Sequence, residues 1–206
     1  MLRIWGRTNS TNVKKALWCA EELGLSYEHI PAGGAYGVVN EAAYRALNPN
    51  GLVPMIEDDG LVLWESNAIV RYLAARYGEG TLYARDPGER AVGDKWMDWA
   101  ATTVVLPFRD VFWNTVRLPP QERNAAAVEA GLKSCGALLA IADAALAEKP
   151  YLSGERFGMG DIPLGCIIYG WYEMPITRPN LPNLAAWYAR LQERPAYRKA
   201  VMLPLT

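Results

Sequence analysis

The sequence predicts an α/β domain followed by an all-α helical-bundle domain, and three observations support this prediction. A strand, a helix and a second strand alternate near the start, which is the order of a βαβ unit. A hairpin and an amphipathic helix follow, up to residue 77. From residue 89 onward the pattern is helical, without a convincing strand. We therefore place the first domain at residues 1–79, a linker at 80–88 and the helical domain at 89–206.

Composition narrows the class of protein. The chain has 206 residues, of which 51% are hydrophobic, enough to form two small cores. Lys and Arg number 21 against 22 Asp and Glu, and no run of like charge argues for a nucleic acid or a membrane as partner. The three cysteines are odd in number and lack metal-binding spacing, so we expect a reduced, cytoplasmic protein without a metal. The most apolar run, 162–172, is too short to span a membrane.

The elements of the first domain can be placed in order. Residues 2–5 form a strand that Gly6 ends, and a helix with its apolar positions on one face follows until Gly24. Residues 27–30 form the second strand, 31–40 a glycine-rich loop and 41–47 a short helix. With the hairpin and the helix that come next, this order predicts a thioredoxin-like domain.

The segment 48–77 contains the strongest local signals. Asn48 to Gly51 is a turn, and a strand starts at Pro54. The Val53–Pro54 bond is a candidate cis peptide. Asp58-Asp59-Gly60 is a hairpin turn before the strand 61–64, and Glu65-Ser66-Asn67 opens a helix.

The start of this helix points to a ligand with an amino-acid head. Free N–H groups and the helix dipole suit a carboxylate, and Ser66 adds a hydroxyl. Glu65 can hold an ammonium group, and Val53 can present its backbone like a strand edge. The alternative is that Ser66 only caps the helix and that Glu65 is solvated.

The second domain is expected to consist of helices. Residues 89–116 form the first, with a bend at Pro107, and Pro119-Pro120 ends it. Residues 121–148 and the nearly all-apolar 161–172 form the next two, the latter in the core of the bundle. Residues 182–192 and 195–202 each begin with Pro at the first turn.

Two stretches carry a resemblance to a known family. NPNGLVPMIEDDGLVLWESNAIVRYLAARY, residues 48–77, resembles the glutathione-binding half of the cytosolic glutathione transferases, and LPNLAAWYARLQERPAYRKA, residues 181–200, resembles their closing helices. The chain looks like a bacterial, theta-like member of the serine type. The resemblance implies the glutathione transferase architecture, a homodimer, and reduced glutathione as cosubstrate with no other cofactor. The implied reaction is attack of the glutathione thiolate on a small hydrophobic electrophile.

The same resemblance implies roles for individual residues. Ser10 lies where theta-like and delta-like members place the catalytic serine, and the amide of Asn12 is a second possible donor to the thiol. The alternative for Ser10 is that it caps the first helix. Val53, before Pro54, would pair with the cysteinyl unit, while Glu65 and Ser66 would hold the γ-glutamyl end.

The sequence departs from the family at two positions. Leu52 stands at a glutathione-binding position where many members have a lysine for the glycyl carboxylate. Arg7, Lys14 or the Gly33–Gly37 loop would substitute for it, or glutathione would bind more weakly. Gly158 replaces a capping Ser or Thr before Asp161, which we expect to be structural and to bind loop N–H groups.

The remaining candidates are weaker. The electrophile pocket would lie between the first loop and the helix after the linker, although aromatic residues at helical spacing more often belong to the core. Its possible lining is Trp99, Thr103, Leu106, Phe108, Arg109, Trp113 and Tyr169. We expect Cys19 and the other cysteines in the core, and His29 as a packed or surface residue. Asp98 is either solvated or a contact across the dimer.

Alternative functions are a glutathione-dependent peroxidase or dehalogenase, and a non-catalytic interaction or ligand-binding module.

Overall fold

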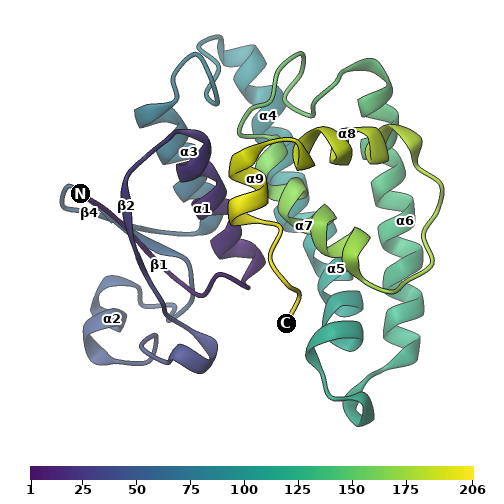
Figure 1. Cartoon of the computed structure of the whole chain (residues 1–206), viewed down its shortest axis with the longest axis horizontal. Helices are drawn as coiled ribbons and strands as arrows, with labels where there is room; N and C mark the ends of the chain where they lie inside the picture. The colour runs from purple at the N-terminus through teal and green to yellow at the C-terminus, as the bar shows by residue number, and fades with distance from the viewer.

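The computed structural model describes all 206 residues, with a sheet-containing first half and a helical second half (Figure 1). The strands form one sheet in the order β2-β1-β3-β4. β1 is parallel to β2 and antiparallel to β3, and β3 is antiparallel to β4, which is the mixed sheet expected of a thioredoxin-like domain. The elements of this half are β1 (Leu2–Trp5), α1 (Thr11–Glu22), β2 (Tyr27–Ile30), η1 (Gly34–Tyr36), α2 (Ala42–Leu47), β3 (Met55–Asp58), β4 (Leu61–Trp64) and α3 (Ser66–Tyr77).

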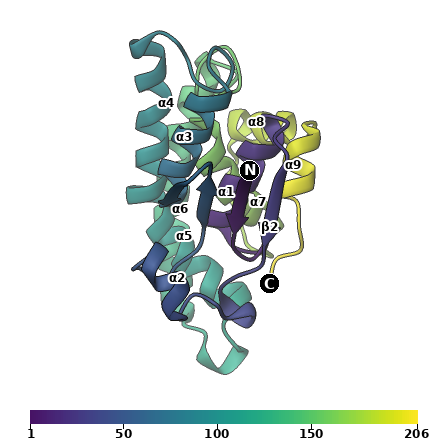
Figure 2. The same ribbon diagram turned by 90° about the vertical axis from the view of Figure 1, so that its left-hand side faces the viewer.

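The sheet buries one face against the helices that follow it. Ile4 of β1 lies opposite Ile56 of β3, and both side chains are fully buried, whereas Arg3, between the buried Leu2 and Ile4, is exposed. This alternation is what a strand with one buried face requires. α1 packs beside α3, and two helices of the second half, α7 and α9, pack on α1. Figure 2 shows the strands in front, with α1 and α7 behind them.

The second half is a helical bundle, as predicted. A continuous helical segment runs from Pro87 to Arg117 and contains two wide, π-type turns. α7 is buried over almost its whole length, in agreement with its apolar sequence. The elements are α4 (Pro87–Trp99), η2 (Ala100–Val104), α5 (Val105–Phe112), η3 (Trp113–Arg117), η4 (Pro120–Glu122), α6 (Ala125–Glu148), α7 (Asp161–Glu173), α8 (Pro182–Gln192) and α9 (Pro195–Ala200).

Several helix boundaries differ from the prediction, by four residues at most. The helix expected from residue 121 begins at Ala125, because the Asn124 side chain accepts a hydrogen bond from the Ala127 N–H and caps it there. The last helix ends at Ala200 and not at 202. The disturbance expected at Pro107 appears as the wide turn η2 just before it. Pro107 has no N–H for the carbonyl four residues earlier, and that carbonyl belongs to this turn.

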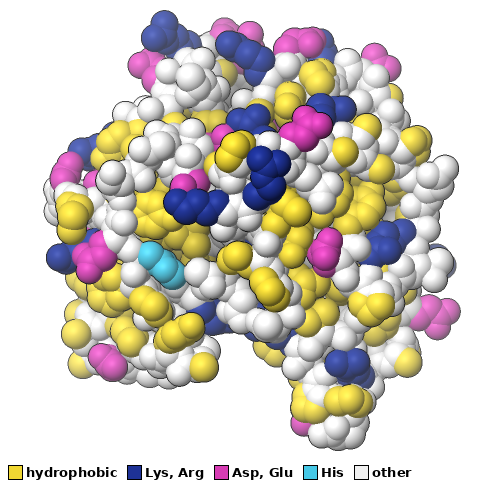
Figure 3. Space-filling view, viewed as in Figure 1, with side chains coloured by type: hydrophobic (Ala, Val, Ile, Leu, Met, Phe, Trp, Pro, Cys, Tyr) yellow, Lys and Arg dark blue, Asp and Glu magenta, His cyan; other side chains and the backbone are white.

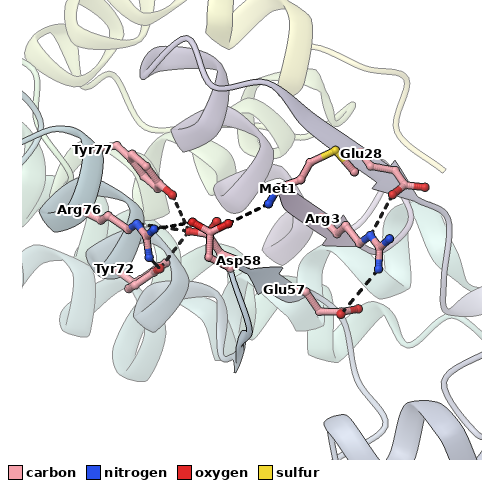
Figure 4. A network of polar contacts seen from close by, with 9 residues as sticks. Met1, Arg3, Glu28, Glu57, Asp58, Tyr72, Arg76 and Tyr77 are labelled. Carbon is pink, nitrogen blue, oxygen red and sulfur yellow. Dashed lines mark hydrogen bonds and ion pairs between the residues drawn. The ribbon is translucent and has the colours of Figure 1, made fainter.

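A polar network joins the β3–β4 turn to α3 (Figure 4). Asp58 is 2% exposed and accepts hydrogen bonds from the hydroxyls of Tyr72, at 2.9 Å, and Tyr77, at 2.7 Å. Its neighbour Asp59 pairs with the amino group of Met1 and with Arg76. Because both tyrosines lie in the second half of α3, the network fixes that helix on the hairpin and thereby sets the direction of its N-terminal end.

Asp161 anchors the start of α7. The side chain is fully buried and accepts hydrogen bonds from the N–H groups of Leu152, Ser153 and Gly158 and from the indole N–H of Trp187. This confirms its predicted structural role. The N-cap of α7 is Gly160, without a side-chain cap, and a Cβ at Gly158 would lie 2.9 Å from the Ser153 side chain, so a larger residue there would require Ser153 to shift.

α6 is the most apolar long helix. It has 24 residues and a window of mean hydropathy 1.5, so by length and composition alone it could cross a membrane. In the structure it packs along α5 and α8. The buried face that makes this packing consists of Gly131, Cys135, Leu139, Ala142 and Leu146.

Candidate functional site

A small cavity of about 50 Å³ lies where the turn before β3 meets the start of α3. It brings together Asn12 and all five residues that the sequence analysis assigned to glutathione. The complete lining is Asn12, Asn48, Asn50, Leu52, Val53, Pro54, Trp64, Glu65 and Ser66.

Val53 presents free backbone groups at this cavity. The Val53–Pro54 bond is cis, as predicted. The carbonyl before it, on Leu52, accepts hydrogen bonds from the Tyr44 hydroxyl and the Asn48 amide, but the N–H and C=O of Val53 have no partner within the chain. An extended peptide can therefore pair with Val53 as it would with an unpaired strand.

The start of α3 is left open rather than capped. Glu65 occupies the N-cap position with φ 72°, a backbone conformation that non-glycine residues rarely adopt, and no side chain caps the helix. The hydroxyl of Ser66, 7% exposed, donates to Asn12 Oδ1 at 3.4 Å. Ser66 is therefore not a helix cap, and the first N–H groups of α3 stay available for an anion.

Lys15 lies directly behind this helix start, and the sequence analysis missed it. Its side chain is 3% exposed, and Nζ donates to Ser66 Oγ at 3.4 Å. Burial lowers the pKa of Lys15 to about 8. The available signal was a pair of adjacent lysines, Lys14 and Lys15, inside a helix segment, residues 13–20, whose other residues are all apolar.

The two predicted thiol donors are placed differently. Ser10 holds the N-cap position of α1, but its side chain makes no capping bond, and its hydroxyl has no hydrogen-bond partner in the chain. Asn12 lines the cavity, and its Oδ1 accepts from Ser66. Since Asn12 Nδ2 donates to no other group, its N–H bonds remain available.

The structure separates the candidates for replacing the usual lysine at Leu52. Lys14 is buried, donates to the carbonyl of Val201 at 2.8 Å and lies over the Tyr169 ring, so it faces the C-terminal segment. Arg7 lies against the glycine loop, since a Cβ at Gly34 would be 3.0 Å from Arg7 Cδ. Arg7 and the glycine loop therefore lie together near Val53, whereas Lys14 lies at the C-terminal segment.

The residues suggested for an electrophile pocket differ in burial, and whether they line one pocket stays a prediction. Tyr169 is buried and donates its hydroxyl to the Leu203 carbonyl, Phe108 is buried, and Trp99 packs edge-on against Trp96. The exposed members of the set are Thr103, Leu106, Arg109 and Trp113, all on the segment from η2 to η3. None of the set lines the small cavity.

The other polar and sulfur-containing candidates have structural surroundings. Cys19, Cys135 and Cys166 are buried, and burial raises the pKa of each thiol. A ring nitrogen of His29 bonds the Gly6 carbonyl at 2.7 Å. Asp98 pairs with Arg71 within the chain. No group of three His, Cys, Asp or Glu side chains is arranged to hold a metal ion.

A second, larger cleft of about 890 Å³ lies between the linker, α4 and residues 149–159. It contains none of the predicted site residues. The cavity at Val53 is therefore distinguished by the chemistry of its lining and not by its size.

Comparison with known proteins places the chain in a family. Residues 1–75 match the model of the glutathione S-transferase N-terminal domain, and residues 94–195 match that of the C-terminal domain. Glutathione S-transferase GstB of Escherichia coli K12 is 50% identical over the full length of both chains. Glutathione S-transferase F14 of Arabidopsis thaliana is 33% identical over 97% of this chain and 80% of its own length.

A solved structure agrees with these matches. The theta-class glutathione S-transferase from Xanthomonas axonopodis pv. citri, crystallised with glutathione bound, superposes with a TM-score of 0.97 at 62% identity, over 100% of this chain and 99% of that one. The chain belongs to the glutathione S-transferase family.

Proposed function

We propose that this protein binds reduced glutathione at the cavity beside Val53 and transfers it to a small electrophile. The observation that carries the proposal is the unpaired backbone of Val53 next to the uncapped start of α3. The Val53 backbone can pair with a peptide as a strand would, and the first N–H groups of α3 can bind a carboxylate. The theta-class relative, crystallised with glutathione bound, and the relative GstB, a glutathione S-transferase, support glutathione as the ligand.

Each part of the tripeptide glutathione is bound by different residues of the site. Val53 pairs with the cysteinyl backbone. Ser66 and the first N–H groups of α3, with Lys15 behind them, hold the γ-glutamyl carboxylate, and Glu65 holds its ammonium group. Arg7 and the neighbouring glycine loop take the place of the missing lysine at Leu52 and receive the glycyl carboxylate.

Ser10 and Asn12 would make the thiol reactive. A free thiol of pKa about 8.5 is mostly protonated at neutral pH, and donors aimed at the sulfur favour the thiolate. The Ser10 hydroxyl and the Asn12 amide N–H have no competing acceptor within the chain. The thiolate then attacks an electrophilic carbon, and the glutathione conjugate forms.

The test is a glutathione titration followed by the ultraviolet absorbance of bound thiolate. We expect a thiolate signal near neutral pH that falls about ten-fold in Ser10→Ala or Asn12→Ala, because a hydrogen bond to a charged group contributes about 1.5 kcal/mol or more. Thr8→Ala, which removes an exposed hydroxyl from the same loop, is the control. Binding without any thiolate signal in the wild type would favour a carrier, and no binding would favour a non-catalytic interaction module.

The three segments 1–79, 80–88 and 89–206, the homodimer and the cytoplasmic location stay predictions. A mass measurement in solution would test the dimer.

A further inference from the structure

Two arginines from opposite halves of the chain meet on one residue next to Ser10. Arg7 Nη1 donates to Asn9 Oδ1 at 2.7 Å, and Arg117 Nη2 donates to the Asn9 carbonyl at 3.0 Å. Arg7 belongs to the first loop, whereas Arg117 ends η3 in the helical half. The fold therefore places two positive charges against the residue that precedes the proposed thiol donor.

No Asp or Glu side chain pairs with these arginines; Asn9 itself donates its amide N–H to Thr206 Oγ1, and the Arg117 guanidinium lies 5.4 Å from the centroid of the Phe112 ring. Neither Arg7 nor Arg117 takes part in an ion pair, although other arginines, Arg71, Arg76 and Arg194, each have acidic partners. Nε of Arg117 is buried without any hydrogen-bond partner. Burial lowers the pKa of both arginines, and the charge of Arg7 lowers the pKa of Arg117 further. Charged groups in such surroundings are normally paired, so an anion from outside the chain would complete the cluster.

The cluster lies where a ligand can reach it. Figure 3 shows the molecule hollowed between the lobe that carries α2 and the lobe that carries η3 and η4. In the same orientation, Figure 1 places the start of α1 and the C-terminal end at the head of this hollow. Both arginines are half-buried, so each keeps part of its surface open to solvent.

The position of Arg117 indicates that it binds the electrophile, which is the second substrate. The proposed function already pairs the two carboxylates of glutathione with the start of α3 and with Arg7. Arg117 reaches Asn9 from the other side, one helical turn after the exposed Trp113. We propose that Arg117 selects electrophiles that carry a carboxylate close to the carbon under attack. This inference rests on the proposed function.

The chemistry of the transfer does not consume the carboxylate. The thiolate forms a carbon–sulfur bond and expels a leaving group with its electron pair. With an activated double bond, the displaced electron pair instead takes a proton from water. In both cases the negative charge of the electrophile is still present in the conjugate, so the conjugate can be used to measure the preference.

The experiment compares two conjugates that differ only in charge, S-carboxyethylglutathione and S-carbamoylethylglutathione. We expect the wild type to bind the carboxylate at least about ten-fold more tightly than the amide, because a charge-assisted hydrogen bond is added. Arg117→Met should reduce this preference to about two-fold or less and leave the Kd of glutathione itself within about two-fold. Arg123→Met, which removes an exposed arginine of the same lobe, should keep the full preference.

Each other outcome has a defined meaning. Equal affinity of the two conjugates in the wild type overturns the inference. An equal loss of glutathione and conjugate binding in Arg117→Met also overturns it, because Arg117 would then hold the glycyl carboxylate. If the wild type does not bind glutathione at all, the proposed function fails, and the two failures are thereby distinguished. Arg117→Lys keeps the charge and should retain most of the preference if the Met variant does not fold; a complete loss in a folded Lys variant counts against the proposal.

Discussion

Asp161 at the start of α7 and Lys15 in α1 are both almost fully buried, but their surroundings differ. Asp161 accepts hydrogen bonds from three backbone N–H groups and one indole. Lys15 contacts one hydroxyl, that of Ser66, at the long distance of 3.4 Å, and forms no ion pair. The chain thus gives the carboxylate four hydrogen-bond donors, although burial still raises the pKa of Asp161, and gives the Lys15 ammonium group a single acceptor.

This difference separates a structural charge from a functional one. Removing a buried charge that satisfies several donors of the chain leaves those donors without an acceptor and destabilises the fold, whereas a buried charge without an ion-pair partner costs free energy until a ligand arrives. Lys15, Arg7 and Arg117 belong to the second kind, and all three lie around the proposed glutathione site. Removing a charge of each kind should therefore change stability in opposite directions.

The largest effect is expected from Asp161→Ala. Four donors, three of them in buried hydrogen bonds, would lose their acceptor at about 1 kcal/mol or more each, so we expect the free energy of unfolding to fall by about 4 kcal/mol. Chemical denaturation at neutral pH measures this loss. A loss below about 1 kcal/mol would mean that water replaces the carboxylate and that the comparison with Lys15 does not hold.

Lys15→Met should act in the opposite direction and raise stability by about 2 kcal/mol at pH 7. The pKa of Lys15 is about 8 in the folded state and 10.5 in the unfolded state. Between these values the unfolded chain binds more protons, so the stability of the wild type rises with pH. The advantage of the variant should therefore shrink from pH 8 towards pH 10.

The measurement for Lys15 is denaturation of both proteins at pH 7 and pH 10, together with a glutathione titration. Glutathione should bind more weakly to the variant, because a positive charge behind the carboxylate site is lost. Lys133→Met, on the exposed face of α6, is the control and should show neither the gain nor its pH dependence. A destabilised Lys15→Met with unchanged glutathione affinity would assign Lys15 to the fold.

Asp58→Ala should give the smallest of the three effects, about 1.5 kcal/mol of destabilisation. Asp58 resembles Asp161 in being buried, but its donors, the hydroxyls of Tyr72 and Tyr77, can turn to water when it is removed. Thermal unfolding detects the loss, and Asp58→Asn, which keeps one acceptor oxygen, should lose less. If the Asp58 variant is as unstable as the Asp161 variant, the number of backbone donors does not explain the difference between the two acids.

Much of the first domain could be predicted because its signals are local. β1, β2 and β4 have the predicted limits, and the cis bond at Pro54 was read from a valine and a proline in a turn. Glu65 and Ser66 were identified because they open a helix directly after a strand. Helix limits were predicted less well where a side chain acts as a cap, as Asn124 does for α6.

The contacts that distinguish the site join distant parts of the chain and could not be predicted. Lys15 reaches Ser66 from another helix, and Arg117 reaches Asn9 from the other half of the protein. Hydrophobic periodicity identifies the face of a helix that is buried, but it does not identify the residue on the far side of the contact.

The sequence by itself determined the two-part architecture, the hairpin and helix that carry Glu65 and Ser66, and the family to which these motifs point. Each of these follows from residues close together in the chain, whose backbone preferences and periodicity act locally. Only the tertiary structure decided that Ser66 is not a cap, that Lys14 faces away from the site and that two unpaired arginines meet beside Ser10. These properties depend on which charges are left without partners once the helices pack, and that is settled only when both halves of the chain are in place.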